Sequence, residues 1–250
     1  MLFRSWKRCK SNGVTDVTEF KIGLDGIVLA QDKGGESIDL TREQITLALA
    51  AEIPQNGELV ANPHETWSDV DSALPDREII VYGPPTTSGT RDAFEDLVME
   101  YASENMSGYE EAYTDIRQDG AYVASGENDN LIVEKIGQNK DAFGIFGYSF
   151  LDENRSQIQA AKIGGVEAKP QAIASGEYPV ARSLFFYTKN SHFDQVNGMK
   201  GYVEMFVSDR MIGPNGLLKD IGLIPLPEDE RSAMRSRLDQ QPQVDLASAE

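Results

Sequence analysis

The stretch from residue 78 to residue 102 constrains the fold of this chain more than any other. A β-rich run, EIIVY, ends at a Gly-Pro-Pro loop, and TTSGTRDAFEDLVMEYA follows directly. Apolar residues in that second part recur with the i, i+3, i+4, i+7 spacing of one helical face, at Phe94, Leu97, Val98 and Tyr101. The sequence therefore predicts a strand, a tight loop and an amphipathic helix in direct succession.

The rest of the chain alternates in the same way. Strands are expected over 20–31, 142–151, 158–163 and 184–188, and helices over 41–51, 129–136 and 196–211. Thr41 should cap the first of these helices with Gln44 completing a capping box, and a turn is expected at Asp25-Gly26. Strands that alternate with helices in this order indicate an α/β protein.

Charge and residue counts exclude several classes of function. The chain has 41 acidic and 23 basic residues, a net charge of −18, which argues against a nucleic-acid or anionic-membrane surface. No stretch approaches the ~18 consecutive apolar residues that insert into a membrane. With one cysteine and two histidines, a Cys-rich metal site, a His-based zinc centre and a Ser–His hydrolase are all disfavoured. We therefore expect no metal and no cofactor.

Residues 86–91 carry the clearest chemical signal. A helix that begins just after a strand presents backbone N–H groups and its positive dipole end at one point. There Gly89 admits an anion without a Cβ, Ser88 and Thr90 add hydroxyl donors, and Arg91 adds a guanidinium fork. Together they predict a cradle for a tetrahedral oxyanion, although Ser and Thr are also ordinary helix caps, so a purely structural reading stays open.

The segment YGPPTTSGTRDAF resembles the Ser-Gly-Thr-Arg-Asp-Ala-Phe signature of the periplasmic phosphate-binding proteins of high-affinity phosphate ABC transporters (PstS type). Further stretches match in the same order, from roughly Cys9 to Arg237: NGVTDVTEFKIGLDGIVLA, WSDVDSALPDREI, DGAYVASGENDNLIVEKIG, AFGIFGYSFLDEN, IASGEYPVARSLFFY and GLIPLP. The resemblance implies a two-lobed periplasmic-binding-protein fold of class II type that closes over inorganic phosphate. It also implies that phosphate meets Ser88, Gly89 and Thr90, that a membrane permease is the partner, and that the location is periplasmic.

Two features depart from the family pattern. An arginine stands four residues before the motif's serine in well-known members, where this chain has Pro84, so Arg91 is the candidate to supply that charge. The family also begins with a strand and a Gly/Ser/Thr-rich loop that complete the phosphate shell with an aspartate. Nothing similar precedes Cys9, and no signal peptide is recognisable. We therefore expect an N-terminally truncated chain with an incomplete first lobe.

The resemblance suggests a domain division and leaves two other functions to weigh. Residues 1–114 are expected to form the incomplete lobe I with the anion loop, 115–183 lobe II, 184–238 the return to lobe I, and 239–250 a polar tail. The main alternative to a phosphate-delivering binding protein is a binding-defective or sensory fragment of such a protein that acts through a partner. An enzyme with Ser88 or Thr90 as nucleophile is disfavoured because no histidine or lysine base lies nearby in the sequence.

Overall fold

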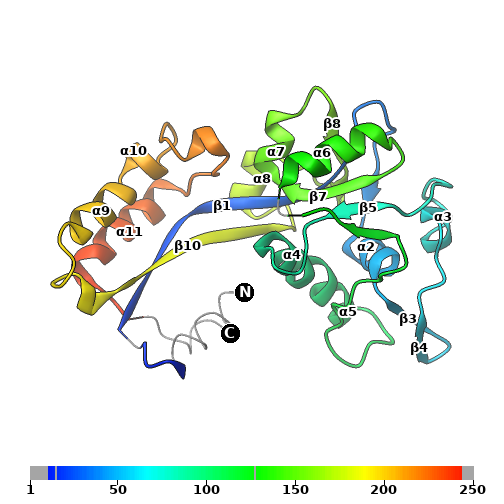
Figure 1. The fold of residues 1–250 in the computed structure, drawn as a ribbon, viewed down its shortest axis with the longest axis horizontal. Coiled ribbons are helices and arrows are strands. Elements are labelled where there is room, and N and C mark those ends of the chain that lie inside the picture. The colour runs from blue at the N-terminus through cyan, green and yellow to red at the C-terminus, as the bar shows by residue number, and fades with distance from the viewer. Residues whose placement is uncertain (1–10, 15, 127, 244–250) are drawn as a thin grey trace. The chain divides into compact units, whose positions relative to one another are not determined.

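The computed structural model describes residues 11–14, 16–126 and 128–243, and the chain forms two compact units (Figure 1). The larger unit is Gly26–Ala181, and the smaller unit combines Met1–Asp25 with Arg182–Glu250. The chain enters the larger unit within β1 (Val17–Asp32) and leaves it at the start of β10 (Ala181–Lys189). The mixture of strands and helices confirms the expected α/β class.

The larger unit contains a mixed sheet. Its remaining elements are β2 (Asp39–Leu40), α2 (Arg42–Leu49), β3 (Glu52–Gln55), β4 (Glu58–Ala61), α3 (Trp67–Val70), β5 (Val81–Gly83), α4 (Gly89–Phe94), the π-helix η1 (Glu95–Glu100), α5 (Tyr101–Asn105), β6 (Tyr122–Ala124), α6 (Asp129–Gln138), β7 (Phe143–Gly147), α7 (Tyr148–Glu153), β8 (Ile158–Ala160), β9 (Lys162–Ile163) and α8 (Pro170–Ser175). In the sheet, β1 pairs with β7, β7 with β5 and β5 with β6, while β8 pairs with β1. Strands β7, β5 and β6 are parallel to one another, and β1 is antiparallel to β7.

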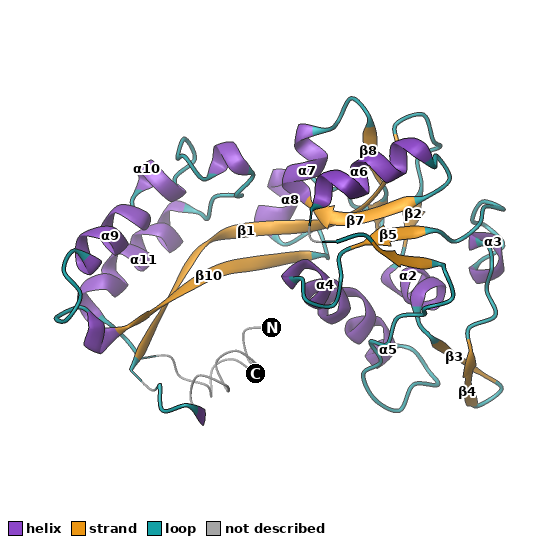
Figure 2. Cartoon of the chain, in the orientation of Figure 1, coloured by secondary structure: helices purple, strands orange, loops and turns teal. Residues whose placement is uncertain are grey.

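Helices cover both faces of this sheet (Figure 2). Helices α6 and α7 lie on one face and α2, α4 and α5 on the other. All five residues of β7 are buried, as expected for a central strand with helices on both sides. The buried Trp67 ring packs edge-on against Phe143 of β7, with ring centroids 5.2 Å apart, and so anchors its segment in the core.

The smaller unit packs helices against a strand pair. The first half of β1 pairs with β10, and the helical elements are η2 (Asn190–His192), α9 (Met199–Phe206), α10 (Asp209–Ile212), η3 (Lys219–Ile221) and α11 (Glu228–Gln240). Its core gathers Phe20, Val203, Val207, Ile212, Leu223 and Leu238. Phe20 also stacks on Phe186 of β10 at a centroid distance of 4.9 Å.

These units divide the chain differently from the lobes expected at the sequence level. Strand β5, from the segment 1–114, pairs with β6 and β7, from the segment 115–183, so the two segments share one sheet. The anion loop therefore belongs to the same unit as residues 115–181. The expected return at residue 184 falls next to the observed return at Arg182. Of the expected tail 239–250, α11 includes the first two residues, and residues 244–250 lie outside the described part.

Three local expectations were wrong. The helix expected over 196–211 is divided into α9, which ends at Phe206, and α10, which begins at Asp209, because the Ser208 backbone between them is extended. The Asp25-Gly26 pair forms no turn but continues β1, because Asp25 binds Arg182 and Gly26 lies where a Cβ would collide with the Ile173 side chain. The glycine permits close packing instead of a turn. The apolar run 142–151 is also not a single strand, because it ends as β7 at Gly147 and continues as helix α7.

Candidate anion-binding site

Three helices begin at one edge of the sheet in the larger unit. Strands β5, β6 and β7 are followed by α4, α6 and α7, respectively. Gly83 of β5 lies opposite Ala124 of β6, and Tyr82 lies opposite Gly144 of β7. The carboxyl ends of the three parallel strands therefore share an edge, which is where ligands bind in open α/β sheets. Helix N-termini at such an edge favour anions.

The structure brings Ser88, Gly89 and Thr90 together at the first of these helix starts. Ser88 is the N-cap of α4, with its Oγ accepting from the Thr90 amide at 3.2 Å. The Ser88 amide donates to the Pro85 carbonyl at 2.9 Å, which closes the loop that leads from β5 into the helix. Gly89 and Thr90 are the first two helical residues, and all three residues are half-buried. Both sequence-level readings of Ser88, helix cap and anion ligand, fit this geometry.

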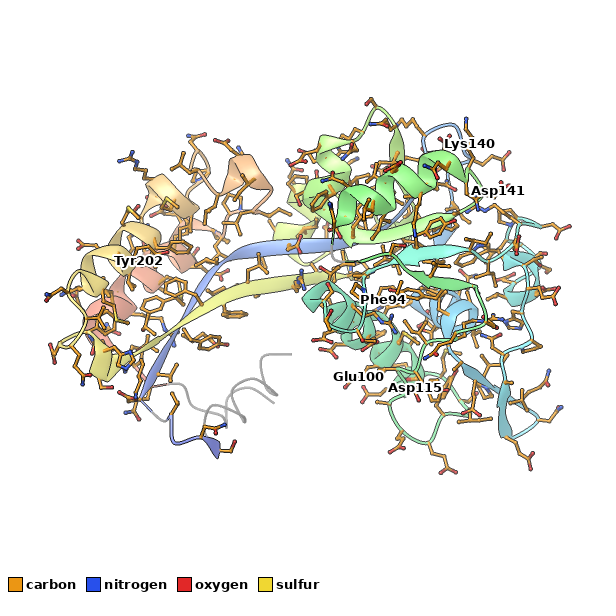
Figure 3. The ribbon with its side chains drawn as sticks, in the orientation of Figure 1. Phe94, Glu100, Asp115, Lys140, Asp141 and Tyr202 are labelled. Carbon is orange, nitrogen blue, oxygen red and sulfur yellow. The ribbon has the colours of Figure 1, made fainter. Side chains whose placement is uncertain are left out.

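The helix that starts here is longer than α4 alone. It continues without a break through η1 and α5, from Gly89 to Asn105, with Phe94 near its beginning and Glu100 further along (Figure 3). The middle section is a π-helix, which the sequence did not predict. Two of its carbonyl groups find donors in α2: Leu97 O accepts from Arg42 at 3.2 Å, and Val98 O accepts from the Thr46 hydroxyl at 3.4 Å. Contacts with α2 thus stabilise an otherwise rare backbone form.

The structure turns Arg91 toward the sheet. Its Nε donates to Glu95 Oε1 at 2.6 Å, and its guanidinium carbon lies 4.6 Å from the ring centroid of Tyr122. Glu95 is one helical turn further from the helix start than Arg91, so this ion pair draws the guanidinium away from Ser88. The side chain of Arg91 is only 8% exposed. Its expected role as a phosphate ligand stays a prediction, and the geometry favours a supporting role.

The neighbouring helix α6 contributes one side chain, Lys135, that sequence reasoning missed. Asn128 caps this helix, and its Oδ1 accepts from the Asn130 amide at 3.1 Å. Lys135 extends from α6 to donate to Ser125 Oγ at 3.0 Å, and its Nζ lies 5.0 Å from the ring centroid of Tyr82. This places a cation beside the residues that follow β6. The only sequence signal for it is the position of a lysine in a helix that follows a strand and a Ser-Gly loop.

The part of the chain that the structure describes has neither a metal-binding cluster nor a membrane-spanning helix. No cluster of three or more histidine, cysteine or acidic side chains there has an arrangement that could hold a metal ion. Nor is any described helix both long and apolar enough to cross a lipid bilayer.

Burial raises the pKa of Tyr122, so its hydroxyl keeps its proton and remains a hydrogen-bond donor at neutral pH.

Comparison with known proteins adds independent information. Residues 4–210 match the family model described as the PBP superfamily domain. The phosphate-binding protein PstS of Staphylococcus saprophyticus is 26% identical over 227 residues, 88% of this chain and 61% of the relative. The phosphate-binding protein PstS of Staphylococcus haemolyticus is 28% identical over 216 residues, 84% of this chain and 58% of the relative. The chain thus spans about 60% of the length of these curated relatives.

Solved structures show the same fold. A possible phosphate binding protein from Planctomyces limnophilus has a TM-score of 0.63 and 26% identity, over 95% of this chain and 77% of that one. PstS from Borrelia burgdorferi has a TM-score of 0.58 and 16% identity, over 85% of this chain and 73% of that one. These likenesses, with the family match, confirm the fold that the sequence resemblance implied.

Proposed function

This chain belongs to the PBP superfamily, and we propose that it is the solute-binding component of a phosphate ABC transporter. Inorganic phosphate is the proposed ligand, held by the Ser88 and Thr90 hydroxyls and by the backbone N–H group of Gly89, while the Thr90 N–H donates to Ser88 Oγ. The observation that carries this proposal is the Ser-Gly-Thr helix start at the carboxyl edge of parallel strands. Similar proteins that are named phosphate-binding PstS support the choice of anion.

The proposal extends to partner, location and type of activity. We infer that the chain delivers phosphate to a membrane permease, that it works in the periplasm or at the cell surface, and that it binds phosphate without transforming it. The names of the two staphylococcal relatives and of the Planctomyces protein describe binding and no reaction. Because Ser88 Oγ already accepts from the Thr90 amide, it is arranged as a cap and ligand donor.

Calorimetric titration of the full chain with inorganic phosphate tests the proposal, with sulfate as the competing anion. Ser88→Ala should weaken phosphate binding by about 10- to 150-fold, the worth of one hydrogen bond to a charged group. The matched control is Thr41→Ala, which removes the N-cap hydroxyl of α2, where Thr41 Oγ1 accepts from the Gln44 amide at 3.1 Å. Each variant should lose about 0.5–2 kcal/mol of stability through its cap.

The two variants therefore separate binding from capping. Equal phosphate affinity in the two variants would refute the assignment of Ser88. A wild-type chain that prefers sulfate would refute phosphate as the ligand. A folded wild-type chain with no measurable phosphate binding would favour the alternative of a sensory or binding-defective protein that acts through a partner.

A further inference from the structure

Tyr122 lies beneath the loop that carries the proposed ligand groups. Its hydroxyl donates to the Pro84 carbonyl at 2.6 Å, and the residue is 8% exposed. The neighbouring residue on β5, Gly83, leaves room for this contact, because a Cβ there would collide with the Tyr122 hydroxyl. A side chain from the adjacent strand β6 thus binds the first residue of the loop.

The Tyr122 ring is also held from the helix side. The Arg91 guanidinium stacks over it, and Glu95 fixes that guanidinium through the 2.6 Å contact with Nε. Arg91 and Glu95 are both on the helical segment that the loop leads into. The loop is therefore connected to the ring at both ends, directly through Pro84 and indirectly through Arg91.

The first half of the loop also has restricted backbone freedom. Two successive prolines fix φ at Pro84 and Pro85, and Pro85 restricts the backbone of the residue before it. The hydrogen bond from the Tyr122 hydroxyl adds a third restraint, because it holds the Pro84 carbonyl in one orientation. A binding loop that is held in its final geometry before the ligand arrives loses less entropy on binding.

We propose that Tyr122 is a positioning residue for this loop, held in place by the Arg91–Glu95 pair. The pair supports the ring and is not the charge that attracts the ligand. The effect on phosphate affinity rests on the proposed function, whereas the effect on the loop itself does not.

Amide hydrogen exchange in the ligand-free chain tests the loop directly. Tyr122→Phe should speed exchange of the Ser88 and Thr90 amides by about fivefold, the worth of one neutral hydrogen bond. The matched control is Tyr178→Phe, because Tyr178 is also buried in the larger unit and its hydroxyl donates to the Ile27 carbonyl at 2.9 Å. The control should leave the Ser88 and Thr90 amides unchanged. Equal exchange at these amides in both variants would overturn the proposal, whether or not the chain binds phosphate.

Phosphate titration adds a readout that a purely structural role would not move. Tyr122→Phe should weaken binding by about fivefold, by the same factor at pH 6 and pH 8, because no charge is changed. Loss of stability with unchanged affinity would contradict the proposal. If wild type and both tyrosine variants bind phosphate equally, only this inference fails. If wild type does not bind, the proposed function fails and hydrogen exchange decides the inference.

A second variant keeps the test open if Tyr122→Phe does not fold. Glu95→Gln should weaken phosphate binding, because Arg91 loses its partner and its stacking on Tyr122 loosens. An increase in affinity would overturn the proposal, since it would mean that Arg91 attracts the ligand directly and that Glu95 had been neutralising it. The sign of the change therefore separates a supporting Arg91 from a ligand-binding Arg91.

Discussion

Replacement of Arg91 by alanine should destabilise the larger unit strongly, even without any ligand. The Arg91 side chain is 8% exposed and its partner Glu95 is 22% exposed, so the change leaves a partly buried carboxylate without its cation. Breaking a fully buried pair costs about 3–5 kcal/mol, and the residual hydration of Glu95 reduces that figure. Lost stacking on Tyr122 adds about 0.5–2 kcal/mol. We expect a loss of about 2–4 kcal/mol in the free energy of unfolding.

Arg155→Ala is the matched control for this prediction. Arg155 pairs with Asp152 at 2.8 Å and lies 5.6 Å from the Tyr148 ring centroid, but its side chain is 49% exposed. Its removal should cost below about 1 kcal/mol. Urea unfolding followed by circular dichroism, with the unfolding temperature as a second measure, compares the two variants. At about 2–4 °C per kcal/mol, Arg91→Ala should lower the melting temperature by about 5–15 °C. The reasoning is refuted if the two variants lose equal stability.

Two further predictions concern Gly83, which precedes the loop, and Tyr109, whose hydroxyl donates to the Glu52 carbonyl of β3 at 3.0 Å. Gly83→Ala should cost about 1–3 kcal/mol of stability, because the added Cβ would displace the Tyr122 ring. The control Gly137→Ala has open space around its Cβ and should be neutral or stabilising. Equal melting temperatures for the two variants would contradict the close packing of Gly83 against Tyr122. Burial, with Tyr113 and Glu52 nearby, raises the pKa of Tyr109 to about 12. The protonated form is therefore favoured in the fold, so the stability that Tyr109 contributes below its unfolded pKa of about 10 should be lost as pH rises toward 12. Urea midpoints measured from pH 9 to pH 12 should fall more steeply for wild type than for Tyr109→Phe, and parallel curves would contradict this.

Local chemistry explains which elements the sequence could predict. The capping box of Thr41 and Gln44 and the N-cap role of Ser88 both follow from side chains that bind backbone groups within three residues, and the structure confirms them. The burial of Trp67 follows from its size in an otherwise polar loop. Such features depend on neighbours in the sequence, so a single sequence specifies them.

The features that the sequence did not predict depend on distant partners. Asp25 and Gly26 have the composition of a turn, but pairing with Arg182 and packing against Ile173 keep them extended. The π-helix after α4 has its donors in α2, more than fifty residues earlier. The direction of Arg91 depends on the position of Tyr122 on the adjacent strand. The sequence could therefore indicate the candidate anion site but not the contacts that support it.

Amide NMR spectra of the full chain, recorded while inorganic phosphate is added, test the central claim most directly. The Gly89 and Thr90 amides lie at the proposed contact, and the Gln44 amide at the capped start of α2 serves as an internal reference. We expect saturable shifts of the Gly89 and Thr90 signals with one apparent dissociation constant, and no shift of Gln44. Saturable phosphate binding that leaves Gly89 and Thr90 unshifted would contradict the account.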